Sequence, residues 1–299
     1  MLDVPWRFLA ILTANGVLVG SMYALVALGF VLIYKATDAI NFAQGEFVMF
    51  AGFLAAAAIG IGGLPWWGGA LVAIAGMIAL GFGLERVVLR PLLGRPIIAV
   101  IMATIGLASV LRGAATMAFG AGVKTIPLPI GTTPIHLGPL ILPPIELVGA
   151  GVSLAFLAGF AWFFIKSRVG VAMRAVADNQ QVAMAMGIDV RRYFALAWAL
   201  GGVVSALGGI LWGAMLAVDN QLALVGLKVF PVMILGGLDS ILGAVVGGLI
   251  VGVVESVSAG FLDPVVGGGT KDFVPYLLMI AVLMVRPEGM FGRRRIERV

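Results

Sequence analysis

The sequence predicts an all-α fold, a polytopic membrane helical bundle organised as a single transmembrane domain over residues 1–299. The chain is 62% hydrophobic and 11% charged, with a mean hydropathy of +1.14, whereas soluble domains carry about 25% charged residues. Residues 8–34 form a run of 27 residues without a charged side chain, and an α-helix needs about 20 such residues to cross the hydrocarbon layer. Because similar runs recur to the end of the chain, no room remains for a sizeable soluble domain.

Successive apolar runs predict the membrane spans, and breaks in composition separate them. The turn at 62–67 combines Gly, Pro and Trp, which is typical of a membrane surface, and residues 120–144 form a loop rich in Pro and Gly. The first run is too long for the apolar part of a signal peptide, so we expect a retained span. In chain order the expected spans cover about 8–34, 40–61, 67–84, 97–119, 145–165, 193–217, 240–258 and 273–286.

The apolar run at residues 226–238 is short, and it is interrupted by Pro231 and by two consecutive glycines, Gly236 and Gly237. We therefore expect a broken or re-entrant helix near 226–238, which is tolerated only where protein or water covers the freed backbone. Lys228 and Asp239 flank this segment. They either take part in the substrate pathway or simply lie at its water-exposed ends. The predicted number of transmembrane helices is eight or nine, depending on this segment.

The distribution of Lys and Arg predicts the orientation in the membrane. Cytoplasmic loops carry an excess of these residues, and fourteen of the nineteen fall on one side against Arg7, Lys124 and Lys271 on the other. We expect an outer N-terminus and a cytoplasmic C-terminus, and this pattern accounts for the net charge of +5 better than nucleic-acid binding does. The three basic groups are Arg86, Arg90 and Arg95; Lys166, Arg168, Arg174, Arg191 and Arg192; and Arg286, Arg293, Arg294, Arg295 and Arg298.

Several functional classes are disfavoured by what the sequence lacks. It has no cysteine, which excludes disulfides and thiolate metal sites. His136, the single histidine, lies beside prolines in an outer loop and is expected to be solvated. Residues 120–125 approach a phosphate-binding loop, but Val123 stands where a Gly must precede the Lys. We therefore expect no enzyme, no metal and no cofactor, and any ATPase must be a separate chain.

Polar residues inside the membrane are the candidates for function, because ionisable groups are costly there. Interrupted helices often bracket the solute route of transporters, and the two interrupted segments here are 41–47 and 226–240. The candidates for a substrate pathway are Asn41, Gln44, Glu46, Lys228, Pro231 and Asp239.

Structural interpretations of the intramembrane charges stay open beside the functional one. Thr37 or Asp38 could cap the second span while Glu46 bonds within the bundle. Arg112 lies deep in the fourth span, where it either snorkels outward or pairs with an acidic group such as Glu255.

The longest basic segment, residues 166–192, is expected on the cytoplasmic side and predicts two short helices, 170–177 and 179–186. Asp178 or Asn179 can cap the second helix. A short helix with basic flanks can lie in a groove on a cytoplasmic partner, or it can lie on the membrane surface without one. The second helix is expected to end at a left-handed Gly187 and to carry an apolar stripe of Val182, Ala185 and Met186.

Four stretches that cover most of the chain resemble the permease subunits of branched-chain amino acid ABC transporters. The second span contains Asn-Phe-Ala-Gln-Gly-Glu, similar to the family pattern Asn-Phe-Ala-[His/Gln]-Gly-[Glu/Asp], and the end contains Arg-Pro-Glu-Gly-Met-Phe-Gly. The sequence departs from the family at Pro231, where a small residue is expected, and at Asp239, where Gly is usual. The stretches are Asn15–Leu25 with Ile40–Phe47, Arg174–Ile188, Gly226–Phe230 with Leu235–Ala244, and Arg286–Gly292.

This resemblance implies an importer of the bacterial cytoplasmic (inner) membrane that works by alternating access. It implies two cytoplasmic ABC ATPase subunits, a second permease that is either the same chain or a homologue, and an extracytoplasmic solute-binding protein. Urea or short-chain amide import within the same family is an alternative, and so is an ion-coupled secondary transporter that uses Glu46, Asp239 and Glu255. The ATPases would dock on the 166–192 loop, where the candidate coupling residues are Arg174, Asp178, Asn179, Val182, Ala183, Met186 and Gly187.

Overall fold

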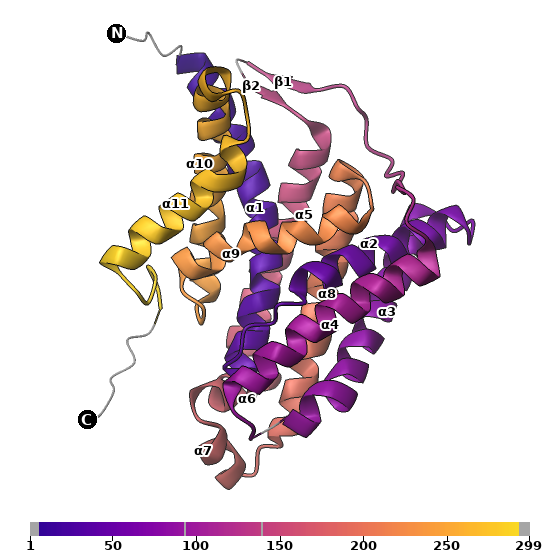
Figure 1. Cartoon of the computed structure of the whole chain (residues 1–299), viewed down its shortest axis with the longest axis vertical. Helices are drawn as coiled ribbons and strands as arrows, with labels where there is room; N and C mark the ends of the chain where they lie inside the picture. The colour runs from indigo at the N-terminus through magenta and orange to yellow at the C-terminus, as the bar shows by residue number, and fades with distance from the viewer. Residues whose placement is uncertain (1–5, 93, 139, 293–299) are drawn as a thin grey trace. The chain divides into compact units, whose positions relative to one another are not determined.

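The structure, a computed structural model, describes residues 6–92, 94–138 and 140–292. These residues are mostly helical, and they contain a two-stranded antiparallel hairpin (Figure 1). Arg293, Arg294, Arg295 and Arg298 of the third basic group lie outside the described residues. In chain order the elements are α1 (Trp6–Thr37), α2 (Gln44–Gly60), α3 (Trp66–Leu84), the π-helix η1 (Glu85–Leu89), the 3₁₀ helix η2 (Arg90–Leu92), α4 (Ile97–Phe119), β1 (Ile135–Leu137), β2 (Leu140–Leu142), α5 (Pro144–Lys166), α6 (Arg168–Asp178), α7 (Gln180–Ala185), α8 (Val190–Leu216), the 3₁₀ helix η3 (Asn220–Ala223), α9 (Leu224–Gly236), α10 (Ile241–Val266) and α11 (Thr270–Val285).

The all-α membrane bundle is confirmed in its class. Among the described residues six helices are long and apolar enough to cross a membrane: α1, α3 with η1 and η2, α4, α5, α8 and α10. Two shorter apolar helices, α2 and the combined η3–α9, have 17 residues each, and α11 has 16. The count of eight or nine spans therefore stays a prediction.

The third span does not end where the sequence predicted. The helix continues from α3 through η1 and η2 as one apolar segment, Trp66–Leu92, whereas the sequence predicted a third span that ends near residue 84. The physical reason is an ion pair inside the helix. Arg90 donates to both carboxylate oxygens of Glu85, at 3.1 and 2.8 Å, and because this pairing lowers the cost of the two charges next to the membrane, the helical segment can continue through them.

The second span begins later than expected, at Gln44 instead of residue 40. Neither Thr37 nor Asp38 caps it, since the residue before its first turn is Ala43, which makes no side-chain capping bond. Asp38 instead adopts a left-handed conformation, with φ 55°, directly after α1. The chain between α1 and α2 is thus a turn rather than the start of a helix.

The segment at 226–238 is not broken at its proline. Helix α9 runs through Pro231 and ends at Gly236, and Gly237 follows with φ 99°. Proline removes one backbone donor but holds φ near its helical value, and such prolines are tolerated in membrane helices whose neighbours cover the backbone. The glycine pair therefore terminates this helix and the proline does not.

The structure divides into two compact units. Three of the four boundaries between them fall inside α1, α5 and α9, and the fourth falls between α4 and β1. Unit 2 comprises residues 28–129 and 157–227, with α2, α3, α4, α6, α7 and α8. Its centre is α8, which packs on α2 and α3 through glycines. A side chain at Gly202 would meet the backbone of Met77, and one at Gly209 would meet the backbone of Val48, so close helix approach depends on these small residues.

Unit 1 comprises the described parts of residues 1–27, 130–156 and 228–299. Here small residues let two helices approach closely, because Gly16 and Gly20 of α1 contact Gly248 and Gly252 of α10 through their backbones. The packing of α10 on α11 is visible in Figure 1 as two adjacent golden helices.

Candidate functional site

Polar side chains gather where α2 begins, in unit 2, and they are fully buried. Asn41 Nδ2 donates to Gln44 Oε1 at 3.3 Å, and Gln44 Nε2 donates to Ser205 Oγ of α8 at 3.0 Å. Ser205 Oγ donates to the carbonyl of Gly201 at 2.8 Å, and Asn41 Oδ1 accepts the N–H of Ala43 at 3.1 Å. These bonds satisfy the buried amides, as burial requires, and they tie the start of α2 to α8.

Thr104 of α4 joins this cluster, although no sequence pattern indicated it. The N–H of Phe42 donates to Thr104 Oγ1 at 3.2 Å, and Thr104 Oγ1 donates to the carbonyl of Ile101 at 2.8 Å. Thr104 is buried. A Thr among apolar neighbours in a helix shows no pattern from which a distant partner can be inferred, so only the packing of α4 against the turn before α2 reveals the contact.

Glu46 and Arg112 form an ion pair between α2 and α4. The distance from Arg112 Nη2 to Glu46 Oε1 is 2.5 Å, and the exposed fractions of the two side chains are 51% and 8%. The proposal that Arg112 pairs with an acidic residue is confirmed, but the suggested partner Glu255 was wrong. Ionisable groups within a membrane are expected to pair in this way.

The two interrupted segments singled out in the sequence touch each other. Gly45 at the start of α2 lies against Ala223, the last residue of η3, and Gly226 in the first turn of α9, and a side chain on either glycine would collide with the backbone of the other segment. The contact falls within unit 2, since that unit includes residues 28–129 and 157–227. Segments 41–47 and 226–240, far apart in the chain, are thereby joined at their first glycines.

Lys228 lies in a charged cluster of unit 1. Its Nζ is 2.7 Å from Asp272 Oδ1 of α11 and 3.8 Å from Glu255 Oε1 of α10. The hydroxyl of Tyr23, on α1, hydrogen-bonds to Glu255. The sequence analysis named Lys228 as a candidate but not Asp272. An acidic residue in the first turn of a helix is common, because it interacts favourably with the helix dipole, and so it does not by itself indicate a functional site.

Pro231 and Asp239, the remaining candidates for the pathway, lie on either side of the end of α9. Pro231 is buried within the helix, and Asp239 is partly exposed in the turn before α10. The stretch Arg286–Gly292 hydrogen-bonds to the end of this helix. Met290 N donates to the carbonyl of Leu235 at 2.8 Å, and Phe291 N donates to that of Gly236 at 3.1 Å. Two of the stretches that carry the family resemblance are therefore bonded to each other. The role of all six candidates in a pathway stays a prediction.

The segment at 166–192 forms the two short helices that the sequence predicted, α6 and α7 (Figure 1). Ser167 caps α6 by accepting the N–H of Gly170 at 2.9 Å. Asn179, one of the two predicted caps, accepts the N–H of Val182 at 3.0 Å. Gly187, just after α7, has a φ of 81°, which confirms the predicted left-handed conformation at the end of this helix.

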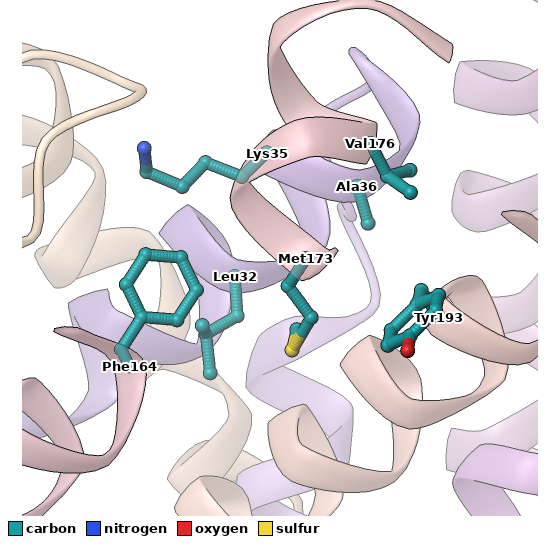
Figure 2. A pocket seen from close by; sticks show the side chains of 7 residues that line it. All are labelled: Leu32, Lys35, Ala36, Phe164, Met173, Val176 and Tyr193. Atoms are coloured by element: carbon teal, nitrogen blue, oxygen red, sulfur yellow. The ribbon is translucent and has the colours of Figure 1, made fainter. Parts of the chain in front are cut away.

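Helix α6 is anchored to the bundle by its apolar face. Figure 2 shows Met173 and Val176 of α6 among Leu32 and Ala36 of α1, Phe164 of α5 and Tyr193 of α8. The gap left between these side chains is about 10 Å³, which is about the space one water needs. Because so little space remains, α6 is expected to move together with the ends of these three helices.

Arg174 serves this anchoring in the structure. Its guanidinium donates to the carbonyl of Phe164 and, at 3.2 Å, to that of Ile165, which are among the last carbonyls of α5. The guanidinium also lies 5.5 Å from the centre of the Phe164 ring. Hydrogen bonds from a cation to the free carbonyls of a helix end are favourable, so Arg174 fixes α6 to the end of α5.

Helix α7 and Met186, the residue that directly follows it, present apolar side chains outward. Val182 and Met186 are 57% and 76% exposed, whereas Ala183 is buried. Gln180 Nε2 donates to the carbonyl of Ala36 at 3.4 Å and ties the start of α7 to the end of α1. The other candidate coupling residues exposed on this segment are Asp178, Asn179 and Gly187.

Within the described ranges, no three or more His, Asp or Glu side chains gather in a way that could hold a metal ion. His136 is exposed in β1, where its strand pairs with β2.

Comparisons with known proteins agree with these features. A family model described as the permease component of a branched-chain amino acid transport system matches residues 12–283. The chain is 32% identical to the high-affinity branched-chain amino acid transport system permease protein BraD of Pseudomonas aeruginosa and 33% identical to LivH of Escherichia coli, over 95% of this chain and 96% of each relative.

A more distant relative is the probable branched-chain amino acid transport permease protein LivH of Methanocaldococcus jannaschii, which is 27% identical over 93% of this chain and 91% of its own length. The match to the family model covers well over half of the chain, and the six long apolar helices make this a multi-pass membrane protein. The chain belongs to the family of branched-chain amino acid transport system permease components.

Proposed function

We propose that this chain is the membrane-spanning permease subunit of an ABC importer that carries branched-chain amino acids across a bacterial cytoplasmic membrane by alternating access. The family match and the names of the relatives support the substrate class. The observation that carries the mechanism is the contrast between α6, which is packed into the bundle, and α7, which exposes Val182 and Met186. In this proposal α6 attaches the segment to the bundle, and α7 offers its exposed side chains to a partner protein.

In this proposal a separate cytoplasmic ATPase receives α7 in a groove. ATP binding moves the ATPase, α7 follows, and the anchored α6 passes the displacement to the ends of α1, α5 and α8. A rigid, closely packed contact is the feature that makes such transmission effective. A second permease, identical or homologous, completes the translocation pathway, and an extracytoplasmic binding protein delivers the solute. The two units of the chain act together as one transmembrane domain.

The pathway is proposed to involve the junction of α2 and α9. Asn41, Gln44 and Glu46 lie at the start of α2, and the Gly45–Gly226 contact joins this start to α9, the helix that carries Lys228 and Pro231 and precedes Asp239. Short apolar helices at corresponding places of a transporter often border the substrate route. The charged groups proposed to meet polar parts of a solute are Glu46 with Arg112 in unit 2 and, separately, Lys228 with Asp272 in unit 1.

Nine crossings fit the proposed orientation better than eight. An outer N-terminus and a cytoplasmic C-terminus require an odd number of crossings. The combined η3–α9 segment has 17 residues, about 27 Å of helix, which approaches the roughly 30 Å of the hydrocarbon layer. We propose that it is the ninth crossing, alongside the six long helices, α2 and α11.

The docking proposal is tested by making α7 polar. Val182→Ser with Met186→Ser should abolish co-purification of the ATPase while the permease still inserts into the membrane. Val171→Ser is the matched control, since this residue of α6 is 52% exposed and lies outside α7. Retention of the ATPase by the double variant, or its equal loss in the control, would refute docking through α7.

The transport proposal is tested by uptake into vesicles. Labelled leucine should accumulate only with ATP, and a protonophore should not prevent it. Excess unlabelled isoleucine should compete, whereas urea should not. ATP-independent uptake that collapses with the protonophore would establish the ion-coupled alternative, and competition by urea alone would establish the amide alternative.

A further inference from the structure

A cavity of about 220 Å³ lies in unit 2 between the end of α1, η1–η2, the start of α4, α7 and α8. It is separate from the α2–α9 junction proposed for the pathway. An engineered apolar cavity of 150 Å³ is large enough for benzene, so this space can hold a metabolite of somewhat larger size. It is smaller than the pockets of about 300 Å³ and more that take drug-sized ligands.

The charged groups of this cavity are of both signs. Glu85 is buried and accepts two hydrogen bonds from Arg90. The further charged residues that line the cavity are Arg95 and Asp38, one cation and one anion. A ligand that carries one carboxylate and one ammonium group matches this pair, because guanidinium binds carboxylate well and a carboxylate accepts from ammonium.

The rest of the lining is apolar and suits an aliphatic side chain. Leu89, Leu92, Ile97, Val100 and Phe194 supply hydrocarbon surface. Trp198 also lines the cavity, and its buried Nε1–H has no hydrogen-bond acceptor among the described residues. An unpartnered buried donor is uncommon and calls for an explanation such as a water or a ligand. Charges of both signs beside apolar walls are the features of a site for an aliphatic α-amino acid.

Gln180 connects the cavity to α7. It lines the cavity, and its Nε2 donates to the carbonyl of Ala36, next to Thr37 and Asp38. A molecule bound here would touch the end of α1 and the first residue of α7 together. It would therefore hold α7 in one position relative to the end of α1, and movement of α7 is what the proposed coupling requires.

We propose that this cavity is a regulatory site that binds a zwitterionic aliphatic amino acid from the cytoplasm and restrains α7. The substrate class and the cytoplasmic side rest on the proposed function, whereas the cavity and its charges do not. Accumulated product would thus slow its own import.

Binding is tested by calorimetry on the purified permease in nanodiscs with L-leucine as the probe. 4-Methylpentanoate lacks the amine and 3-methylbutylamine lacks the carboxylate, so each should bind about tenfold or more weakly, because each loses a hydrogen bond to a charged group. Arg95→Gln should weaken leucine binding to the same extent. Arg86→Gln, on the same basic segment but outside the cavity lining, should leave it unchanged. Absence of leucine binding, or equal affinities of the two variants, would overturn the proposal.

Regulation is tested with the complete importer in proteoliposomes loaded with leucine on the ATPase side. Internal leucine should lower ATP hydrolysis, and the half-inhibitory concentration should rise about tenfold in Arg95→Gln relative to Arg86→Gln. Lack of inhibition in an importer that still takes up external leucine would refute the regulatory site alone. Lack of ATP-driven leucine uptake in the unaltered importer would instead refute the proposed function, and calorimetry would still report on the cavity.

Discussion

The backbones of Gly45 in α2 and Gly226 in α9 lie in direct contact. A Cβ placed on Gly226 would be 2.6 Å from the backbone nitrogen of Gly45, closer than real Cβ contacts permit. This one contact joins the two segments that the sequence marked as interrupted, and neither glycine can be replaced without moving a helix.

The first prediction concerns this junction. Gly226→Ala should destabilise the protein by about 1–3 kcal/mol, because an added methyl group forces the closely packed backbones apart. Gly106→Ala is the control, since Gly106 in α4 has open space around it and Ala favours a helix over Gly by about 1 kcal/mol. Thermal unfolding in detergent should show a lower midpoint for the first variant and an equal or higher one for the second. Equal midpoints for Gly226→Ala and the unaltered protein would contradict the packing.

The second prediction concerns the Glu46–Arg112 pair. Glu46→Gln and Arg112→Gln should each destabilise the protein, but the double variant should cost less than their sum, since the second change removes a charge that the first left without its partner. The coupling free energy is expected to be about 0.5–3 kcal/mol.

The matched control for this cycle combines Glu46→Gln with Arg90→Gln. Arg90 bonds to Glu85 and shares no partner with Glu46, so these two effects should add within about 0.5 kcal/mol. Free energies of unfolding from denaturant titration measure both cycles. Additivity of the Glu46 and Arg112 changes would show that the pair contributes nothing to stability.

The third prediction concerns the number of crossings. Because the chain has no cysteine, single cysteines can be labelled without background. With nine crossings, Asp239→Cys should react with a membrane-impermeant maleimide only from the cytoplasmic side, and Lys271→Cys only from the outside. Thr132→Cys and Asp178→Cys serve as the outer and cytoplasmic references. Labelling of Asp239→Cys from outside would show that η3–α9 is re-entrant and would rule out the ninth crossing.

The fourth prediction separates anchoring from docking in the 166–192 segment. Arg174→Leu should loosen α6 from α5, since it removes the bonds to the carbonyls of Phe164 and Ile165, each worth about 1.5–3 kcal/mol for a charged donor. Limited proteolysis of membranes should then cut this segment faster. Arg168→Leu removes an equal charge from an exposed neighbour and should leave the rate unchanged. Equal rates for both variants would mean that Arg174 does not hold α6.

Much of the fold was predictable because it depends on short stretches of chain. The apolar runs predicted the bounds of α1, α4, α5 and α8 to within three residues. This is because the cost of placing a charge or a free backbone group in lipid applies to each segment separately. The same holds for Asn179 and Gly187, whose roles depend on the next few residues alone.

The errors share a different origin. The end of α3, the partner of Arg112 and the effect of Pro231 each depended on a contact or compensation that the local pattern did not show. Arg90 neutralises Glu85 inside the helix, and Glu46 reaches Arg112 from another helix. Sequence patterns show that burying these charged side chains costs free energy, but they do not show which partner residue offsets that cost.

The sequence alone determined that this protein is a multi-span membrane permease with a two-helix basic segment, because hydrophobic length, helix caps and family motifs are properties of the chain in order. Only the tertiary structure decided which face α6 buries, that Arg174 bonds to the end of α5, and that Gly45 meets Gly226. The reason is geometric: helix rotation and packing set which side chains meet, and residues far apart in sequence contribute equally to that choice.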